Sequence, residues 1–526
     1  MHIVILLAFV LVLTFRQNPP ENPPEPYGLA VLVAAVAVYV ALAGALAALC
    51  AARTLRVLTG PPAPTGRRKR NVLPLLLQAY LLGGLAQLFF LGWGYAVDES
   101  WIGQVPLLSE AVPLLPFLAA LTLVWLAEYP VHQQMRQRLA ERLADEGWRP
   151  TVWSRGQFLT FNVRHQFLFI AVPVGLIWLA RDFLERNGPA VQAAADWTTA
   201  RLHVPPLGPA GQETLAVGLP LAASLAVFLV VPVLLVRVWK TSPLPPGELR
   251  DDLLHTLRSL RVRCRPPRVW HSGGVIANAG VMGLIAPLRY VLLSDALLTH
   301  ADRGQVQAVV AHEAGHMQQH HIFYSVLFTL AVIAWGSLLA DRAATAWPAY
   351  DLVWQSVALL AMAVGWGFGF GWISRRFERQ SDVIAAWAAR GAGASPASDR
   401  GEGVLPSRLA GILPARGDEA GLTSSIDQAN GSHNAGETPA PRDARVTPEG
   451  VAVFASALRR VAQLNGMSPT ASNWRHGSIE FRVNYLMSLA VTNGTREPID
   501  RQVRRIKLAL WTAALAAAGA VVWSLI

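Results

Sequence analysis

The most constraining feature of this sequence is a series of apolar runs, each close in length to the hydrocarbon core of a membrane. A helix needs about 20 apolar residues to cross that core, because it rises about 1.5 Å per residue. Hydrophobic residues make up 53% of the 526-residue chain and charged residues only 15%, a balance that does not fit an ordinary soluble domain. We therefore expect a multi-span helical membrane protein with these spanning runs: Gly28–Ala52, Val72–Val97, Pro106–Ala127, Thr214–Val236, Ile322–Ala340, Leu352–Ile373 and Leu508–Ile526.

Two further apolar runs are shorter. Ile3–Phe15 has no basic segment before it and no small-residue cleavage site after it, so an uncleaved anchor is favoured over a signal peptide. Phe167–Ala180 spans the membrane if it extends to Leu184, and otherwise lies partly in the interface. Counting both runs, we expect nine spans.

Arginine and lysine residues cluster at the ends of the apolar runs, as the orientation of membrane proteins requires. The cluster Arg67–Arg70 predicts that the loop after the second run lies in the cytoplasm. With nine spans, the other basic loops fall on that side, and the acidic pair Asp98 and Glu99 falls outside. The membrane therefore explains the formal charge of +11, and no base-reading motif favours a nucleic-acid partner.

The stretch "VVAHEAGHMQQHH", Val309 to His321, is the first candidate for chemistry, because it holds four histidines and a glutamate. The chain has only two cysteines, Cys50 and Cys264, which predict neither a disulfide framework nor a thiolate metal site. Any metal must therefore bind to histidine and carboxylate groups.

The residues around this stretch predict a helix. Asp302 and Gln305 form a capping pair, and apolar residues follow at helical spacing: Val306, Val309, Val310 and Ala314. On that helix His312 and His316 lie one turn apart, where two imidazoles can reach one ion, and Glu313 is displaced toward the neighbouring position. This is the HExxH arrangement of zinc peptidases.

His320 continues the same helical face but does not fit as a third ligand. On a continuous helix it lies roughly 12 Å from His312, whereas both rings would have to be about 2 Å from one zinc ion. We predict that His320 and His321 are interfacial or solvated side chains.

A third ligand must lie on the same side of the membrane, and "SRRFERQSDVIAA", Ser374 to Ala386, meets this condition. Glu378 lies beyond two predicted spans, and an even number of crossings returns the chain to the side of His312. Asp382 follows one helical turn later, where it could accept the free N–H of a ligating histidine. By itself this segment fits a basic membrane flank with a local ion pair better, and only its combination with HExxH favours a metal site.

Together, His312-Glu-Ala-Gly-His316 and Glu378-Arg-Gln-Ser-Asp382 resemble the membrane-integral gluzincin peptidases, the family that includes the CAAX prenyl protease and the bacterial stress protease HtpX. The similarity extends from about Val275 to Leu486, and residues 391–450, rich in Gly, Ala, Pro and Ser, predict a mobile insertion within it. The resemblance implies a mainly α fold, in which membrane helices carry a zincin-like α+β peptidase domain on the cytoplasmic side.

The same resemblance implies a place for the substrate. Ile276–His300 resembles the family's edge strand with the strand and helix that follow it, and that edge pairs with the substrate backbone. Asn278, Ala279 and Gly283 are the positions that would do so here. The segment "IANAG" could instead be an ordinary turn beside a strand.

A second segment, "WRHGSIEFRV", resembles the family's His-Pro…Arg segment. His476 and Arg482 would then orient the substrate and stabilise the oxyanion. Gly477 stands where the family usually has proline, so the local turn is expected to differ.

The expected function is peptide-bond hydrolysis by a zinc metalloendopeptidase. Zn2+ would be held by His312, His316 and Glu378 and would activate a water, with Glu313 as the general base that passes the proton to the leaving amine. The expected partners are a peptide or membrane-protein substrate and the lipid bilayer, and no nucleic acid. The alternative is a non-catalytic zinc-binding membrane scaffold or transporter. The position of Glu313, which does not suit a third ligand, argues modestly against it.

High Ala, Leu and Arg usage without an organelle signal favours a bacterial inner membrane, with the active site on the cytoplasmic side. The sequence identifies neither the substrate, prenylated or not, nor the oligomeric state. The predicted division is 1–240, a multi-span membrane region; 241–390, the first peptidase part with two spans; 391–450, the insertion; 451–506, the second peptidase part; and 507–526, a C-terminal membrane helix.

Overall fold

The computed structural model describes residues 1–17, 27–59, 72–144, 152–201, 209–389, 446–492 and 495–525. The chain forms two compact units, Met1–Lys240 and Thr241–Ile526. Helices make up most of both units, and the one sheet of the described residues lies in the second. The predicted mainly α class is therefore confirmed. The predicted division of the chain into five segments stays a prediction.

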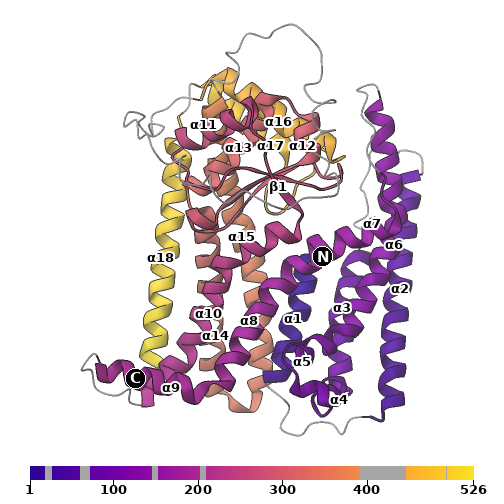
Figure 1. The fold of residues 1–526 in the computed structure, drawn as a ribbon, viewed down its shortest axis with the longest axis vertical. Coiled ribbons are helices and arrows are strands. Elements are labelled where there is room, and N and C mark those ends of the chain that lie inside the picture. The colour runs from indigo at the N-terminus through magenta and orange to yellow at the C-terminus, as the bar shows by residue number, and fades with distance from the viewer. Residues whose placement is uncertain are drawn as a thin grey trace. The chain divides into compact units, whose positions relative to one another are not determined.

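The first unit is built from helices, and the longest of them pack side by side (Figure 1). α2 packs along α6, and α8 packs along α10. The helices are α1 (His2–Gln17), α2 (Leu29–Thr59), α3 (Leu73–Phe90), α4 (Trp93–Asp98), α5 (Leu108–Ala111), α6 (Leu115–Arg142), α7 (Arg155–Asn162), α8 (Leu168–Arg186), α9 (Gly188–Arg201) and α10 (Pro209–Val238), with the short turns η1 (Trp101–Gln104), η2 (Val112–Leu114) and η4 (Val163–Phe167).

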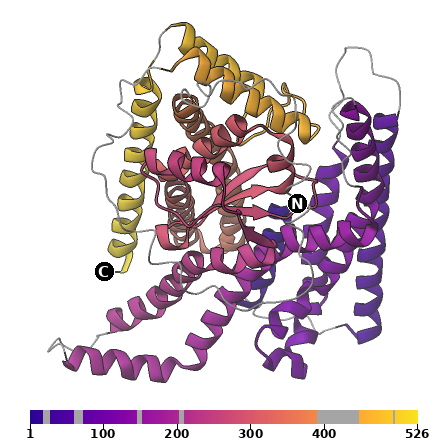
Figure 2. The ribbon, with the colours of Figure 1, turned by 45° about the horizontal axis from the view of Figure 1, so that its top comes forward.

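The second unit combines a small sheet with short and long helices. Figures 1 and 2 show the strands and the shorter helices gathered at one end of the long helices α14, α15 and α18. Its helices are α11 (Glu248–Ser259), α12 (Asp295–His300), α13 (Arg303–Gln318), α14 (His321–Ala346), α15 (Asp351–Ala388), α16 (Pro448–Leu464), α17 (Ile479–Val491) and α18 (Glu497–Leu525), with the turns η5 (Ala286–Leu288) and η6 (Pro348–Tyr350).

The sheet has four strands in the order β1-β2-β4-β3: β1 (Thr241–Pro243), β2 (Arg268–Trp270), β4 (Tyr290–Ser294) and β3 (Ala279–Met282). β4 pairs with β2 in parallel and with β3 in antiparallel register, with Ala279 opposite Leu293. All five residues of β4 are buried, and Val291 and Leu293 join a core that includes apolar residues of α11, α13, α15 and α16. β3 is left at an edge of the sheet, packed against α13.

Seven of the described helices are long and apolar enough to cross a membrane: Leu29–Thr59, Leu73–Phe90, Leu108–Glu141, Arg155–Arg186, Gly218–Val238, His321–Ala346 and Val353–Ala388. The chain is a multi-pass membrane protein. Two predicted runs are not among these seven. Ile3–Phe15 lies in the short helix α1, and Leu508–Ile526 lies in α18, whose last predicted residue is outside the described residues. The orientation that needs nine spans stays a prediction.

The structure corrects the bounds of two predicted runs. The run predicted to continue to Val97 is interrupted, because α3 ends at Phe90 and Gly92 adopts a left-handed φ of 93° before α4 begins. The marginal run Phe167–Ala180 belongs to a longer continuous helical segment, Arg155–Arg186, because a π-helical turn joins α7 to α8. The segment Arg155–Arg186 is long enough to cross the membrane without lying partly in the interface.

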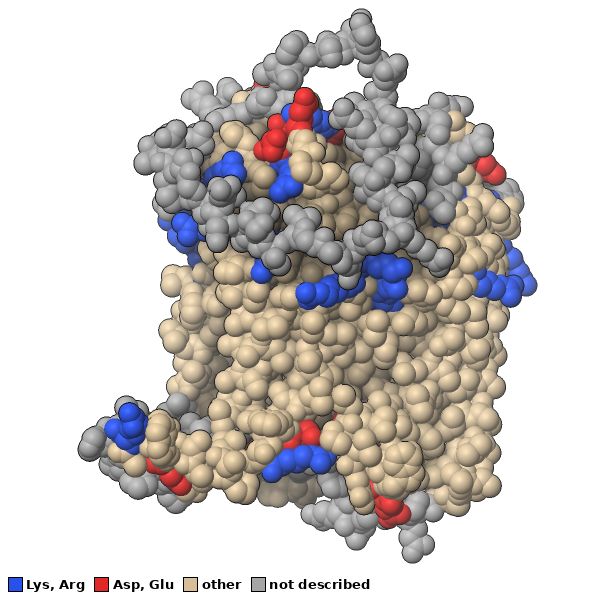
Figure 3. All heavy atoms as spheres, viewed as in Figure 1, with Lys and Arg blue, Asp and Glu red and all other residues tan. Residues whose placement is uncertain are grey.

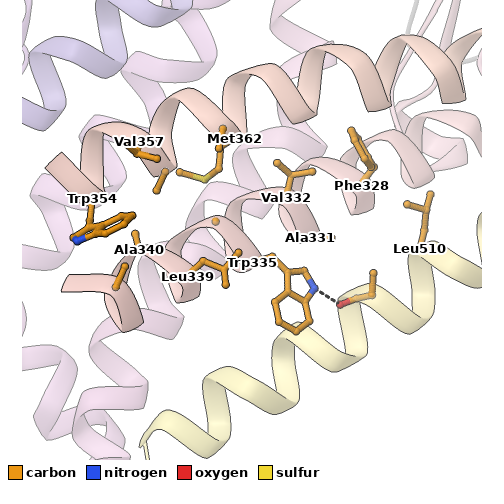
Figure 4. A pocket seen from close by; sticks show the side chains of 15 residues that line it. Phe328, Ala331, Val332, Trp335, Leu339, Ala340, Trp354, Val357, Met362 and Leu510 are labelled. Carbon is orange, nitrogen blue, oxygen red and sulfur yellow. Dashed lines mark hydrogen bonds between the residues drawn. The ribbon is translucent and has the colours of Figure 1, made fainter. Parts of the chain in front are cut away.

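The long helices present uncharged side chains along their middle, and Lys and Arg side chains lie near their ends on the face that Figure 3 shows. Between α14, α15 and α18 lies an apolar cavity of about 540 Å³ (Figure 4). Trp335 points toward α18, and its indole N–H donates to the carbonyl of Ala513 at 3.1 Å. This bond ties α18 to α14 within the second unit.

The predicted insertion lies almost wholly outside the described residues, which resume at Val446. Soon after this point α16 begins at Pro448, and Gly450 is buried within its first turn. Thr447 caps that helix by accepting the N–H of Gly450, a local signal that the compositional reading did not use.

Candidate metal site

Helix α13 carries the predicted histidine pair. Asp302 and Gln305 form a complete capping box, in which each side chain accepts the other residue's backbone N–H, so the predicted start of the helix is confirmed. The predicted apolar face is buried in the core: Val306, Val309, Val310 and Ala314. With that face anchored, His312 and His316 project from one side of the helix one turn apart.

Helix α15 carries the predicted carboxylates. It runs without interruption from Asp351 to Ala388, so the apolar span and the "RRFERQSD" segment belong to one continuous helix. Glu378 and Asp382 lie one turn apart on it and are both buried, at 4% and 0% exposure. Such burial of two carboxylates requires charged or metal partners nearby.

Gly315 allows the two helices to meet. A side-chain carbon added at Gly315 would lie 3.1 Å from the Cα and 3.2 Å from the Cβ of Ser381 on α15. The glycine between the two histidines therefore lets α15 approach closely, and this approach brings Glu378 to His312 and His316.

The three side chains converge. One ligand atom from each of His312, His316 and Glu378 can be chosen so that all lie within 4.8 Å of one another. The Nε2 atoms of the two histidines are 3.2 Å apart, and the Glu378 oxygens lie 3.4 Å from His312 and 3.6 Å from His316. Two imidazoles and one carboxylate that face a common centre can bind a metal ion.

The polar atoms of this cluster support a metal rather than a closed hydrogen-bond network. Oε2 of Glu378 is buried and has no hydrogen bond, although Arg482 lies 3.4 Å away. Buried carboxylate oxygens without a hydrogen bond are costly unless an ion satisfies them. On the far side of its ring, Nδ1 of His312 lies 3.1 Å from Oδ1 of Asp382. A carboxylate in this position can orient the ring from outside the cluster, and this role of Asp382 stays a prediction.

The two residues of the "WRHGSIEFRV" segment reach the same cluster. Nδ1 of His476 is 2.8 Å from Oε1 of Glu378, and its side chain is 43% exposed. Arg482 is buried and donates through Nε and one terminal nitrogen to the two oxygens of Asp382, at 2.8 and 2.5 Å. Gly477 has a φ of 75°, which proline cannot adopt, so the turn here differs from a His-Pro turn.

The electrostatics of the cluster separate the two histidines. Burial lowers the pKa of His316 to about 3, so this ring is neutral and its lone pair is available to a metal. Burial also acts to lower the pKa of His312, but the carboxylates of Asp382 and Glu378 outweigh it and raise that pKa to about 9. A metal must therefore displace a proton from His312 at neutral pH. Burial opposes the charge of Arg482, but Asp382 and Glu378 raise its pKa further.

Glu313 lies beside the cluster without being one of its three ligands. Burial raises the pKa of its carboxyl group to about 7, and the nearby charge of His312 opposes the shift. A carboxyl group with a pKa near the working pH can both accept and release a proton, which is the property required of a general base.

The prediction for His321 was wrong. His320 is exposed, as expected, but His321 is only 2% exposed and its Nδ1 lies 2.9 Å from Nδ1 of His316. The prediction assumed one continuous helix. In the structure α13 ends at Gln318, His320 takes a left-handed φ of 57°, and a new helix starts at His321. The break turns His321 back toward the site, and no composition or spacing signal in the sequence indicated it.

The predicted substrate segment lies at the edge of the sheet. Asn278 directly precedes β3 and exchanges hydrogen bonds with Ser294, and Ala279 is the first residue of the strand. Gly283 follows the strand with a φ of 103°, and a side chain there would collide with the carbonyl of Leu288. Of the segment "IANAG", only Ala279 and Gly280 belong to β3, and its contact with a substrate stays a prediction.

The close packing at Gly315 yields a testable expectation. We expect Gly315→Leu to destabilise the protein by about 1–3 kcal/mol through overpacking and to weaken metal binding, because α15 must move away with Glu378. Thermal unfolding and metal content of the purified protein measure both effects. Gly304→Ala on the same helix is the control, since its added carbon meets nothing closer than 3.4 Å. Normal metal binding by Gly315→Leu would contradict the role given to this contact.

Comparison with known proteins supports the predicted resemblance. Residues 244–398, which contain HExxH and Glu378, match Peptidase family M48. The chain is also 28% identical over 182 residues to the CAAX prenyl protease 1 homolog of Arabidopsis thaliana, an alignment that covers 31% of this chain and 42% of that protein. The chain thus matches less than half of the length of this curated relative. The predicted similarity to the membrane metallopeptidase family is confirmed.

Among solved structures, the crystal structure of S. mikatae Ste24p aligns with 89% of this chain and all of that chain. The two are 12% identical in sequence and have a TM-score of 0.34. A TM-score this low does not by itself establish a shared fold.

Proposed function

We propose that this membrane protein, similar over residues 244–398 to Peptidase family M48, is a zinc-dependent endopeptidase. The observation that carries the proposal is the convergence of His312 and His316 on α13 with Glu378 on α15, more than 60 residues later in the sequence, on one centre with Glu313 beside it. Metal ligands alone would fit a scaffold or a transporter. A partly exposed carboxyl group next to them, with a pKa raised to about 7, favours catalysis.

The donor set fits zinc. Two imidazoles and one carboxylate are a common ligand set of catalytic zinc sites, which keep one coordination position open. When bound, zinc would lower the pKa of a water molecule toward 7 and polarise the scissile carbonyl group. His312, His316 and Glu378 would hold the ion, and Asp382 would keep the His312 ring in place through its Nδ1.

Glu313 would move the proton of the reaction. Its raised pKa lets the carboxylate accept a proton from the attacking water and then deliver it to the nitrogen of the leaving amine. Because Glu313 is adjacent to His312 on α13, the helix that presents the ligand also fixes the position of the base.

His476 and Arg482 would favour the negatively charged tetrahedral state of the substrate. His476 is exposed enough to be reached by a substrate, whereas Arg482 is locked to Asp382 and adds positive charge from behind the ligands. Donors and cations placed where negative charge develops lower the barrier most.

The substrate would bind as an additional strand. β3 pairs on one side with β4 and forms the other edge of the sheet, so an extended peptide could add to it through main-chain hydrogen bonds. Asn278, Ala279 and Gly283 frame this edge, and the contact of β3 with α13 would place the peptide near the ligands. Such binding recognises the main chain of the substrate, so it is compatible with many peptide or membrane-protein substrates.

Asn465 supports the segment that leads into this edge. Its side-chain amide pairs with Ala277 as a strand would, accepting the N–H at 3.2 Å and donating to the carbonyl at 2.7 Å. Loss of two such bonds costs on the order of 1–3 kcal/mol, so Asn465→Ala should raise KM for an extended peptide by about 5–150-fold and leave kcat nearly unchanged. Steady-state kinetics measure this, with the exposed Ser468→Ala as control. A fall in kcat at constant KM would contradict it.

The proposal extends to location. Basic residues at the helix ends support a cytoplasmic active site, and the composition supports a bacterial inner membrane. A prenylated peptide and a damaged membrane protein are both compatible with the site.

Removal of the metal tests the function. Treatment of the purified protein with a chelator is expected to stop cleavage of an unfolded membrane-protein substrate, and stoichiometric zinc is expected to restore it, because the open coordination position exists only with the ion bound. Gel analysis of substrate fragments provides the measurement. A zinc-binding scaffold or transporter would bind the ion but cleave nothing in either state, and that result would overturn the proposal.

A further inference from the structure

His321, which the metal site does not use directly, is held in one orientation by its surroundings. It is the first residue of α14, is 2% exposed, and its ring stacks on Phe377 with the centroids 4.1 Å apart and the planes at 5°. Both ring nitrogens have close partners. Nδ1 lies 2.9 Å from Nδ1 of His316, and Nε2 lies 2.8 Å from Oε1 of Gln380.

The direction of these hydrogen bonds can be worked out from Asp500 on α18. Nε2 of Gln380 donates to Oδ1 of Asp500 at 2.6 Å, and a carboxylate can only accept. The other oxygen of Asp500 accepts a hydrogen bond from Nε of Arg496 at 2.9 Å. The amide of Gln380 therefore turns its nitrogen to Asp500 and its oxygen to His321.

The oxygen of Gln380 decides which nitrogen of His321 carries the proton. A carbonyl oxygen only accepts, so Nε2 of His321 must be the donor. Among the described residues, its partners within hydrogen-bond distance are Gln380, His316 and Ser381, none of them a carboxylate, and a buried cation without an opposite charge is costly. His321 is therefore neutral, and its Nδ1 is left as an acceptor.

The same argument then determines the tautomer of His316. Because Nδ1 of His321 accepts, Nδ1 of His316 carries the proton and donates to it. The lone pair of His316 is left on Nε2, the atom that faces His312 and Glu378. If His321 were to donate instead, the proton of His316 would sit on Nε2, among the ligand atoms, where it would exclude a metal.

We propose that His321 is a positioning residue, which acts with Gln380 and Asp500 as a relay that holds His316 in the tautomer and orientation needed for zinc. The inference rests on the proposed zinc site. It links that site to α18, the helix that continues from Asp500 into the apolar segment packed along α14. Neighbours of this kind change metal affinity by about 10–100-fold in metalloproteins.

The test measures zinc affinity of the full-length protein in detergent by competition with a chelator of known affinity. His321→Phe keeps an aromatic ring on Phe377 but removes the acceptor, and should weaken zinc binding about 10–100-fold. His321→Asn restores an acceptor oxygen near the position of Nδ1 and should recover most of the affinity, which a purely structural role would not predict. His320→Asn is the matched control, because His320 is exposed and Asn tolerates its left-handed φ.

Asp500→Asn provides a second route if His321→Phe does not fold. An asparagine can present either its oxygen or its nitrogen to Gln380, so the amide is no longer fixed, and zinc binding should weaken about 3–10-fold. Zinc affinity of folded His321→Phe or Asp500→Asn equal to that of the unmodified protein would overturn the relay. The proposed function fails separately, if the unmodified protein binds zinc and cleaves no peptide.

Discussion

Glu313→Gln is expected to abolish peptide-bond hydrolysis while zinc stays bound. Glutamine has nearly the same size and occupies the same place on α13, but its amide cannot accept the proton of the attacking water. Glu313 is not one of the three converging ligands, so the ion should remain. Proton transfer by a positioned side chain contributes about 10²–10⁴ in rate, so we expect kcat to fall by about that factor.

The measurement for Glu313→Gln pairs zinc content with cleavage of an unfolded membrane-protein substrate. Glu480→Gln is the matched control, since Glu480 is an exposed glutamate in the first turn of α17 and the same change there should leave both values intact. Unchanged cleavage by Glu313→Gln would remove this residue from the mechanism. Lost zinc would instead show that Glu313 is a ligand.

Glu378→Gln is expected to have the largest effect on the metal. Its carboxylate lies 3.4 Å from His312 and 3.6 Å from His316, and the amide would lack the charge that attracts the ion. Residues that merely orient ligands already account for about 10–100-fold in affinity, so loss of a ligand should weaken zinc binding by more than roughly 100-fold. Chelator competition on the purified variant measures this, and hydrolysis should be lost in parallel.

Two comparisons make the Glu378 result interpretable. Glu313→Gln serves as the internal reference, because both changes replace a carboxyl group of the same site by an amide and only one removes a ligand. Thermal unfolding without added metal checks that the variant is folded, since His476 and Arg482 also contact this carboxylate. A folded Glu378→Gln protein with normal zinc affinity would end the assignment of Glu378 as the third ligand.

The parts of the fold that sequence predicted are those that depend on local patterns. A membrane span is recognised from about 20 consecutive residues, and seven such helices lie in the part of the chain that the structure describes. The start of α13 was predicted from Asp302 and Gln305, three residues apart, and its buried face from the spacing of four apolar residues. Helix ends were less predictable, as the early end of α3 shows, because apolar residues continue beyond Gly92.

Local sequence patterns predicted only part of the candidate site. His312 and His316 follow from helix geometry alone, while Glu378 required an argument about the number of membrane crossings and a resemblance to a known family. The structure places all three together, and Asp382 beside them. The prediction for His321 was wrong because positions calculated along an ideal helix do not hold beyond a break in that helix. The break at His320 is a left-handed backbone conformation that the residue type does not dictate.

By itself, the sequence determined that helices cross a membrane, that one of the remaining helices presents two imidazoles on one turn, and that a carboxylate returns to the same side. Only the tertiary structure decided which groups surround the ligands: Arg482 against Asp382, and Gln380 and Asp500 behind His321. The physical reason is range. Hydropathy and helical period act between neighbours in the chain, whereas contacts between residues 59 to 120 positions apart depend on how closely helices can pack, as Gly315 against Ser381 shows.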